Sequence, residues 1–163
     1  MRLFLAQPAT LYDYAGLQED FSPCISGHWR TAPFLHATVL FLGDRFVPER
    51  IIDTVSAGDY RLEDAFIRGV DRFAHNRIFY AASEHPAMVE TYHRLSEMFS
   101  LRHGRPFIPH VTLMRYKRID VGCFEKEKTE LEGIVAGKLE GGLKLMKSTL
   151  TPAGAVYETL YRF

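Results

Sequence analysis

The sequence predicts an α+β fold with two pseudo-symmetric lobes, in which antiparallel sheets face a central groove and helices lie outside. The first observation is a repeated tetrapeptide, His36-Ala37-Thr38-Val39 and His110-Val111-Thr112-Leu113, each copy set in an apolar run typical of a strand. The second is a similar apolar segment, Arg2–Ala6 and Arg77–Ala81, at nearly the same distance before each copy. Such an internal repeat predicts two related lobes within a single domain of residues 1–163.

Composition limits the classes of protein that the chain can represent. The chain has 163 residues, which is the size of one domain, and 20 Lys and Arg balance 20 Asp and Glu. A broad basic surface for a long polyanion is therefore not indicated, while a local basic cleft is compatible with this balance. No apolar run reaches the roughly 20 residues that span a bilayer, and the N-terminal run is too short for a signal peptide. We expect a soluble, cytoplasmic protein that does not bind membranes, and a monomer.

The cysteines show no pattern of a metal site. Cys24 and Cys123 lie far apart in the sequence and form no CxxC spacing. We expect both to be reduced thiols in a cytosolic protein.

The remaining pattern alternates strands with helices. Gln7 and Pro8 are expected to end the first strand, and a short helix is expected from about Thr10 to Glu19. The other expected elements are a helix from Pro48 to about Ala57, mixed strands between Tyr60 and Phe73, a strand at Arg77–Ala82, a helix that Pro86 opens and Gly104 ends, a charged helix or loop at Glu125–Glu132, and a hairpin of Leu143–Leu150 with Ala155–Tyr161.

The repeated His and Thr residues predict acid–base chemistry at phosphorus. Side chains two apart on a strand share a face, so each strand presents one His and one Thr together. Two histidines across a groove can act as general base and general acid, because an unperturbed pKa near 6.5 allows one neutral and one protonated ring. The hydroxyls of Thr38 and Thr112 can donate to phosphate oxygens. This arrangement requires no metal and no cofactor.

The histidines allow two other interpretations. A lone His on an apolar strand is more often a structural residue, but two copies in matching positions of a repeat favour a site. A zinc site needs about three or four protein ligands. The other five histidines show no ligand spacing, and those near the predicted helix, His85 and His93, are expected to be solvated; the five are His28, His75, His85, His93 and His103.

The chain resembles the two-histidine phosphoesterase superfamily, and within it the RNA 2′,3′-cyclic phosphodiesterases, also called the 2′-5′ RNA ligase or LigT-like family. The segments that carry the resemblance are Arg2–Ala6 with Pro8, Trp29, His36–Gly43, Pro109–Leu113 followed by Arg115, and Ser148–Tyr157. The resemblance implies hydrolysis of a 2′,3′-cyclic phosphate at an RNA end to a 2′-phosphomonoester, as in RNA processing, with 2′-5′ RNA ligation as a reverse-type reaction. It implies RNA ends or oligonucleotides as partners.

The resemblance also implies a role for each residue of the repeat. His36 would be the proton donor to the leaving 3′ oxygen, and His110 would be the proton acceptor that activates water. Thr38 and Thr112 would bind the phosphate. The alternatives are a related esterase acting on another small cyclic phosphate or a 2′-5′ oligonucleotide, and a non-catalytic module that binds RNA ends.

Further candidates for substrate contact lie beside the repeat. They are Arg115, Phe41 and Phe107, and for Phe41 and Phe107, as for Trp29 and Tyr14, core packing competes with stacking on a base. Strand alternation predicts that Arg115 points away from the face of His110 and Thr112. A structural ion pair is therefore an equal alternative for Arg115.

Overall fold

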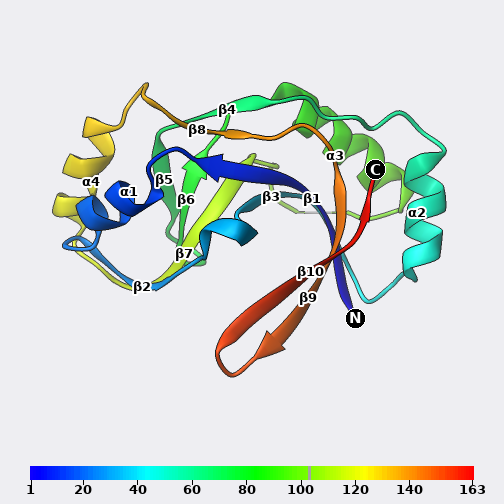
Figure 1. Ribbon diagram of the computed structural model, residues 1–163, viewed down its shortest axis with the longest axis horizontal. Coiled ribbons are helices and arrows are strands. Elements are labelled where there is room, and N and C mark those ends of the chain that lie inside the picture. The colour runs from blue at the N-terminus through cyan, green and yellow to red at the C-terminus, as the bar shows by residue number, and fades with distance from the viewer. Residues whose placement is uncertain (103) are drawn as a thin grey trace.

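The computed structural model describes residues 1–102 and 104–163, which form a curled antiparallel sheet with four helices packed on it (Figure 1). His103, one of the histidines considered above, lies outside the described residues. The strands are β1 (Arg2–Leu11), β2 (Ile25–Trp29), β3 (His36–Gly43), β4 (Ala65–Arg68), β5 (Val70–Phe73), β6 (Ile78–Ala82), β7 (His110–Ile119), β8 (Val135–Leu139), β9 (Lys144–Thr151) and β10 (Gly154–Arg162). The helices are α1 (Tyr14–Phe21), the 3₁₀ turn η1 (Ala32–Phe34), α2 (Pro48–Ser56), α3 (Pro86–Met98) and α4 (Val121–Glu130).

The sheet is ordered β10-β9-β1-β3-β7-β6-β5, with β2 beside β7, and β8 joins β1 to β4. The two strands that carry the repeated tetrapeptide, β3 and β7, are neighbours at the centre of this order. The predicted α+β class, with antiparallel strands inside and helices outside, is confirmed. The His and Thr residues project from adjacent strands of one sheet, because β3 and β7 join the two halves.

The strand register reveals an approximate two-fold relation between the halves. β3 pairs with β7 through Ala37 and Val111, which occupy the same position in the two tetrapeptides. On one side Pro8 pairs with His36, and on the other Ala82 pairs with His110. We infer that β1 and β3 correspond to β6 and β7, about an axis that passes between Ala37 and Val111.

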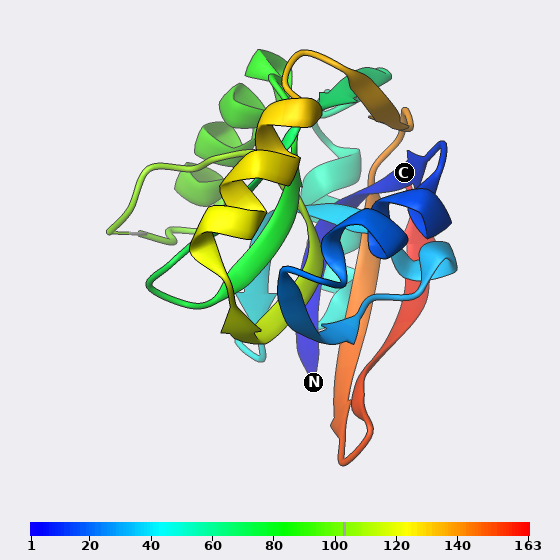
Figure 2. The same cartoon turned by 90° about the vertical axis from the view of Figure 1, so that its left-hand side faces the viewer.

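The helices lie in two pairs at opposite ends of the sheet (Figure 1). Figure 2 looks onto the end where α1 and α4 contact each other, and α2 and α3 lie at the other end. Each pair takes one helix from each half of the sequence. Each end of the molecule is therefore built from both halves.

One core lies between the helices and the sheet face that they cover. Proline opens α2 and α3, where the missing amide proton costs no hydrogen bond. Apolar side chains at helical spacing then bury one stripe of each helix. The buried helical members of the core are Tyr14, Leu17 and Phe21 of α1, Ile51 and Val55 of α2, Met88, Tyr92 and Leu95 of α3, and Phe124 of α4. The opposite sheet face carries a smaller apolar cluster of Phe4, Ala6 and Met146, together with the His and Thr residues of the tetrapeptides.

Three predicted element bounds are wrong. β1 continues through Gln7 and Pro8 to Leu11, because the segment beyond Pro8 finds a new partner in β8. The helix that follows correspondingly starts later, at Tyr14. The helix that Pro86 opens ends at Met98, well before Gly104, and the backbone then turns at Ser100 with a φ of +52°.

The prediction of reduced cysteines is also wrong. Cys24 and Cys123 form a disulfide across 99 residues, with their Cα atoms 5.2 Å apart. The fold brings them together because β2, which follows Cys24, pairs with the end of β7 just before α4, where the amide of Asp120 donates to the carbonyl of Cys24 over 2.7 Å. Sequence separation carries no information about that distance.

His85 is buried, where the sequence predicted a solvated side chain. Its Nε2 lies 3.0 Å from Oε1 of Gln7, which is fully buried and donates through Nε2 to the Glu63 carbonyl. Burial lowers the pKa of His85. Among the described residues, no helix is long and apolar enough to cross a membrane.

Candidate active site

A β-bulge follows the threonine in each tetrapeptide. Thr112 pairs with Tyr80 but Met114 pairs with Phe79, so Leu113 is an extra residue in β7. In β3, Thr38 pairs with Ala6 and Leu40 with Leu5, so Val39 is extra. Both bulges place two consecutive apolar side chains in the core, namely Val39 with Leu40 and Leu113 with Met114.

The bulges return the next side chain of each strand to the face of the histidines. Arg115 pairs with Ile78, two residues before Tyr80, and therefore shares the face of Thr112. Phe41 shares the face of Thr38 for the same reason. The predicted orientation of Arg115 is therefore wrong, because simple alternation does not hold across a bulge. Arg115 and Phe41 are both exposed.

The register brings the two histidines and two threonines into one square. Because Ala37 pairs with Val111 in antiparallel strands, His36 lies opposite Thr112 and Thr38 lies opposite His110. Opposite side chains start about 4.5–5.5 Å apart and diagonal ones about 7–8 Å apart. The two histidines occupy a diagonal of this square.

Each histidine ring is oriented by the same backbone hydrogen bond. Nδ1 of His36 lies 2.8 Å from the Phe34 carbonyl, and Nδ1 of His110 lies 2.7 Å from the Ile108 carbonyl. A carbonyl only accepts, so Nδ1 carries a proton in both rings. In the neutral form Nε2 is therefore the basic nitrogen of each ring, available to take or hold a proton.

Aromatic rings enclose both histidines. His36 contacts Phe4 and Tyr157 with ring centroids 5.1 and 5.2 Å apart. His110 contacts rings from β5 and β6 in the same manner, Phe73 at 5.1 Å and Tyr80 at 5.4 Å. The two environments are alike although their aromatic partners come from different strands.

This enclosure determines the titration of the site. Burial lowers the pKa of both histidines below the ordinary value of 6.5. The positive charges of Arg30 and of His110 lower the pKa of His36 further. Lowered pKa values favour the neutral form of both rings near pH 7 in the free protein. The effect of the His110 charge on the pKa of His36 reflects the proximity of the two rings.

A cavity of about 460 Å³ opens beside the square, at the end where His110 and Thr38 lie. Its lining includes the candidates Phe41 and Phe107, together with Phe73, His75, Asn76 and Arg105. The cavity therefore combines aromatic rings with polar and cationic side chains next to one histidine of the site.

The aromatic candidates of the sequence divide between this cavity and the core. Phe107 stacks on Tyr92 with centroids 4.3 Å apart, and Phe41 is 43% exposed beneath the Arg2 guanidinium. Trp29 and Tyr14 instead contact each other and pack in the core. Only Phe41 and Phe107 of these candidates are therefore placed beside the square.

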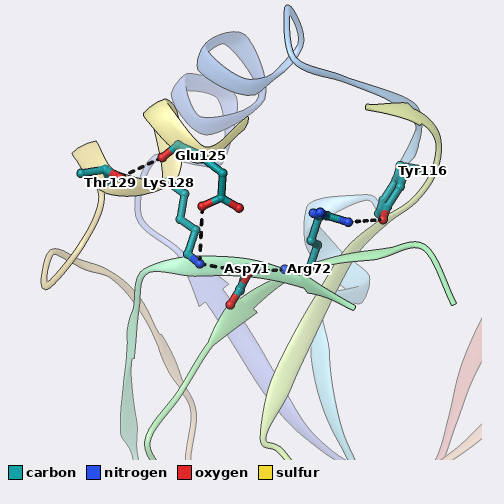
Figure 3. Close-up of polar contacts among 6 residues, drawn as sticks. All are labelled: Asp71, Arg72, Tyr116, Glu125, Lys128 and Thr129. Carbon is teal, nitrogen blue, oxygen red and sulfur yellow. Dashed lines mark hydrogen bonds and ion pairs between the residues drawn. The ribbon is translucent and has the colours of Figure 1, made fainter. Parts of the chain in front are cut away.

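A polar network holds the strand that packs on His110 (Figure 3). Lys128 of α4 lies 3.2 Å from the Asp71 carboxylate of β5 and 3.9 Å from Glu125 of α4. The Arg72 guanidinium donates to the Tyr116 hydroxyl of β7 over 3.2 Å. These contacts connect β5 to α4 and, across β6, to β7, and Phe73 at the end of β5 contacts His110. In the part of the chain that the structure describes, no three His, Cys, Asp or Glu side chains gather as a metal site.

The chain is similar to known proteins in sequence and in fold, although no family model matches it. It is 28% identical over 134 residues to an RNA 2′,3′-cyclic phosphodiesterase of Methanocaldococcus jannaschii, covering 77% of this chain and 78% of the relative. Among solved structures, TT0787 of Thermus thermophilus is 27% identical with a TM-score of 0.68, covering 100% of this chain and 97% of that one. LigT of E. coli, crystallised with 3′-AMP, shares the fold at 19% identity and a TM-score of 0.71, covering 99% of this chain and 96% of that one.

Fold and site together define a protein of the two-histidine phosphoesterase class, with a His and a Thr on each of two central strands. Within that class the chain resembles the LigT-like family in sequence and in fold. The family resemblance of the sequence is confirmed. Side chains that sequence reasoning did not assign to the site are Phe4, Phe73, Tyr80 and Arg30. Phe4 and Tyr80 lie in the repeated apolar segments, which indicated strands and not a site, and Phe73 and Arg30 belong to no repeated pattern.

Proposed function

We propose that this protein hydrolyses 2′,3′-cyclic phosphates at the ends of RNA or oligonucleotides to 2′-phosphomonoesters, by acid–base catalysis without a metal. The observation that carries the proposal is the diagonal of His36 and His110, each opposite a threonine, across one strand pair. The similarity to a curated RNA 2′,3′-cyclic phosphodiesterase supports this reaction.

The proposed reaction is an in-line displacement at phosphorus. His110 takes a proton from water through Nε2 as the water oxygen bonds to phosphorus. The bond from phosphorus to O3′ breaks, and Nε2 of His36 gives its proton to O3′. The hydroxyls of Thr38 and Thr112 donate to the non-bridging oxygens, where negative charge concentrates. Binding of the phosphate anion raises the pKa of His36 and opposes the effects of burial and of Arg30, so that His36 enters the reaction protonated.

Alanine substitution of either histidine tests this proposal. We expect His36→Ala and His110→Ala each to lower turnover of a 2′,3′-cyclic mononucleotide by about 10²-fold or more. The matched control is His93→Ala, which changes an exposed histidine of α3. Wild-type activity should persist in EDTA. Undiminished turnover in both site variants would exclude the acid–base roles, and RNA-end binding without wild-type turnover would instead support a binding module.

The cavity beside His110 favours 2′-5′ RNA ligation as a second candidate activity. It opens on the side from which the nucleophile attacks, and its 460 Å³ and aromatic lining with Phe41 and Phe107 suit a nucleoside that brings a 5′-hydroxyl in place of water. Incubating cyclic-ended RNA with a 5′-hydroxyl oligonucleotide should then give a 2′-5′ linkage, and Phe107→Ala should reduce ligation more than hydrolysis. A screen of other cyclic phosphates and 2′-5′ dinucleotides tests the alternative substrates.

A further inference from the structure

Cationic side chains cluster on two adjacent strands of this neutral chain. β7 carries Arg115, Lys117 and Arg118, all exposed, and Arg30 follows β2 directly. Neither strand contains an aspartate or glutamate. Among the described residues, none of these four cations forms an ion pair within 4.0 Å, although five ion pairs occur elsewhere. We call these four residues the basic strip.

The register places Arg115 and Arg118 of the strip on the sheet face of the square. Arg115 pairs with His28 of β2, and Arg118 pairs with Ser26, two residues earlier on the same strand. A second bulge at Lys117 keeps Arg118 on the face of Arg115, because Tyr116 pairs with Gly27 between them. The face of β7 that begins with His110 and Thr112 therefore continues as Arg115 and Arg118.

Arg30 connects the strip to His36. Its amide donates to the Leu113 carbonyl over 2.7 Å, which holds the chain beside β7. Its guanidinium lies 5.9 Å from the centre of the Tyr157 ring, which itself contacts His36. The charge of Arg30 is close enough to influence His36. The strip thus starts at the His36 end of the square, opposite the cavity beside His110.

We propose that the basic strip binds the backbone phosphates on the 5′ side of the cyclic end. The substrate is then an oligonucleotide, and its bound strand runs from the square along β7. This inference rests on the proposed function. If His36 protonates O3′, the ribose lies at the His36 end, and its 5′ oxygen leads outward in the same direction. Unpaired cations on that path are placed to neutralise successive phosphates.

Comparison of a short and a long substrate tests the strip. We expect Arg118→Ala to leave kcat/KM for a 2′,3′-cyclic mononucleotide unchanged and to lower it about five- to tenfold for a short RNA with a cyclic end. Lys126→Ala is the matched control, because it removes one exposed cation from α4. Arg105 lines the cavity beside His110, at the opposite end of the square. Arg105→Ala therefore tests whether the RNA strand runs along β7 or through that cavity. An unchanged rate on RNA in Arg118→Ala, an equal loss on both substrates, or a selective loss in Arg105→Ala would overturn the proposal.

Salt dependence gives a readout that does not need turnover. For RNA that ends in a 2′-phosphate, the slope of log K against log salt concentration should become shallower by roughly 0.7 for each strip cation removed. If the wild type turns over no cyclic phosphate, the proposed function fails, and this slope still decides whether the strip binds RNA. An unchanged slope in Arg118→Ala and Lys117→Ala would contradict binding of RNA by the strip.

Discussion

His36 and His110 have the same chemistry and different electrostatic surroundings. Both donate from Nδ1 to the carbonyl two residues upstream, and burial lowers the pKa of both. Only the pKa of His36 is lowered further by the charge of Arg30. In the proposed reaction Arg30 therefore opposes protonation of the acid until an anionic substrate arrives.

Titration of His36 tests this electrostatic effect. The wild-type pKa should lie below 6.5, and Arg30→Met should raise it towards 6.5, because a nearby positive charge that disfavours the imidazolium is removed. NMR of the imidazole nitrogens measures both values, with His110 in the same spectra as the internal reference. A lower pKa in Arg30→Met would contradict the assigned effect.

At the scale of elements, α3 is bound to the sheet by its apolar stripe. Leu95 is fully buried, whereas Met98 on the same helix is 57% exposed. Leu95→Ala should lower the free energy of unfolding by about 2–5 kcal/mol, since it leaves a cavity. Met98→Ala should change it by less than about 0.5 kcal/mol. Denaturant unfolding of both variants measures the difference, and equal effects would show that the stripe is not what binds the helix.

At the scale of the whole molecule, the Cys24–Cys123 disulfide joins the turn between α1 and β2 to α4 across 99 residues. Cross-linking so long a loop lowers the entropy of the unfolded chain, by up to roughly 4–5 kcal/mol in the chain-entropy model. Cys123→Ser should therefore lower the Tm and leave activity at moderate temperature intact, because neither sulfur lies in the square of His36, Thr38, His110 and Thr112. The reductant-treated wild type should melt like the variant, and a reduced wild type that keeps its Tm would exclude a stabilising role.

Much of the fold could be predicted from local patterns. The helices opened by Pro48 and Pro86 begin where predicted, and the hairpin of β9 and β10 lies close to its predicted bounds, because capping, periodicity and turn residues act within a few positions. The extension of β1 past Pro8 could not be predicted in this way, since its partner β8 is distant in sequence.

The sequence by itself determined the α+β class and the two repeated His and Thr residues, because periodicity and internal repetition are properties of the chain, and its motifs carry the family resemblance. Only the tertiary structure decided the face of Arg115, the disulfide and the basic strip. Each of these depends on register, bulges or contacts between residues far apart in the chain, and a pattern of single residues does not encode such distances. Tertiary pairing thus places Arg115 beside the square of His36, Thr38, His110 and Thr112.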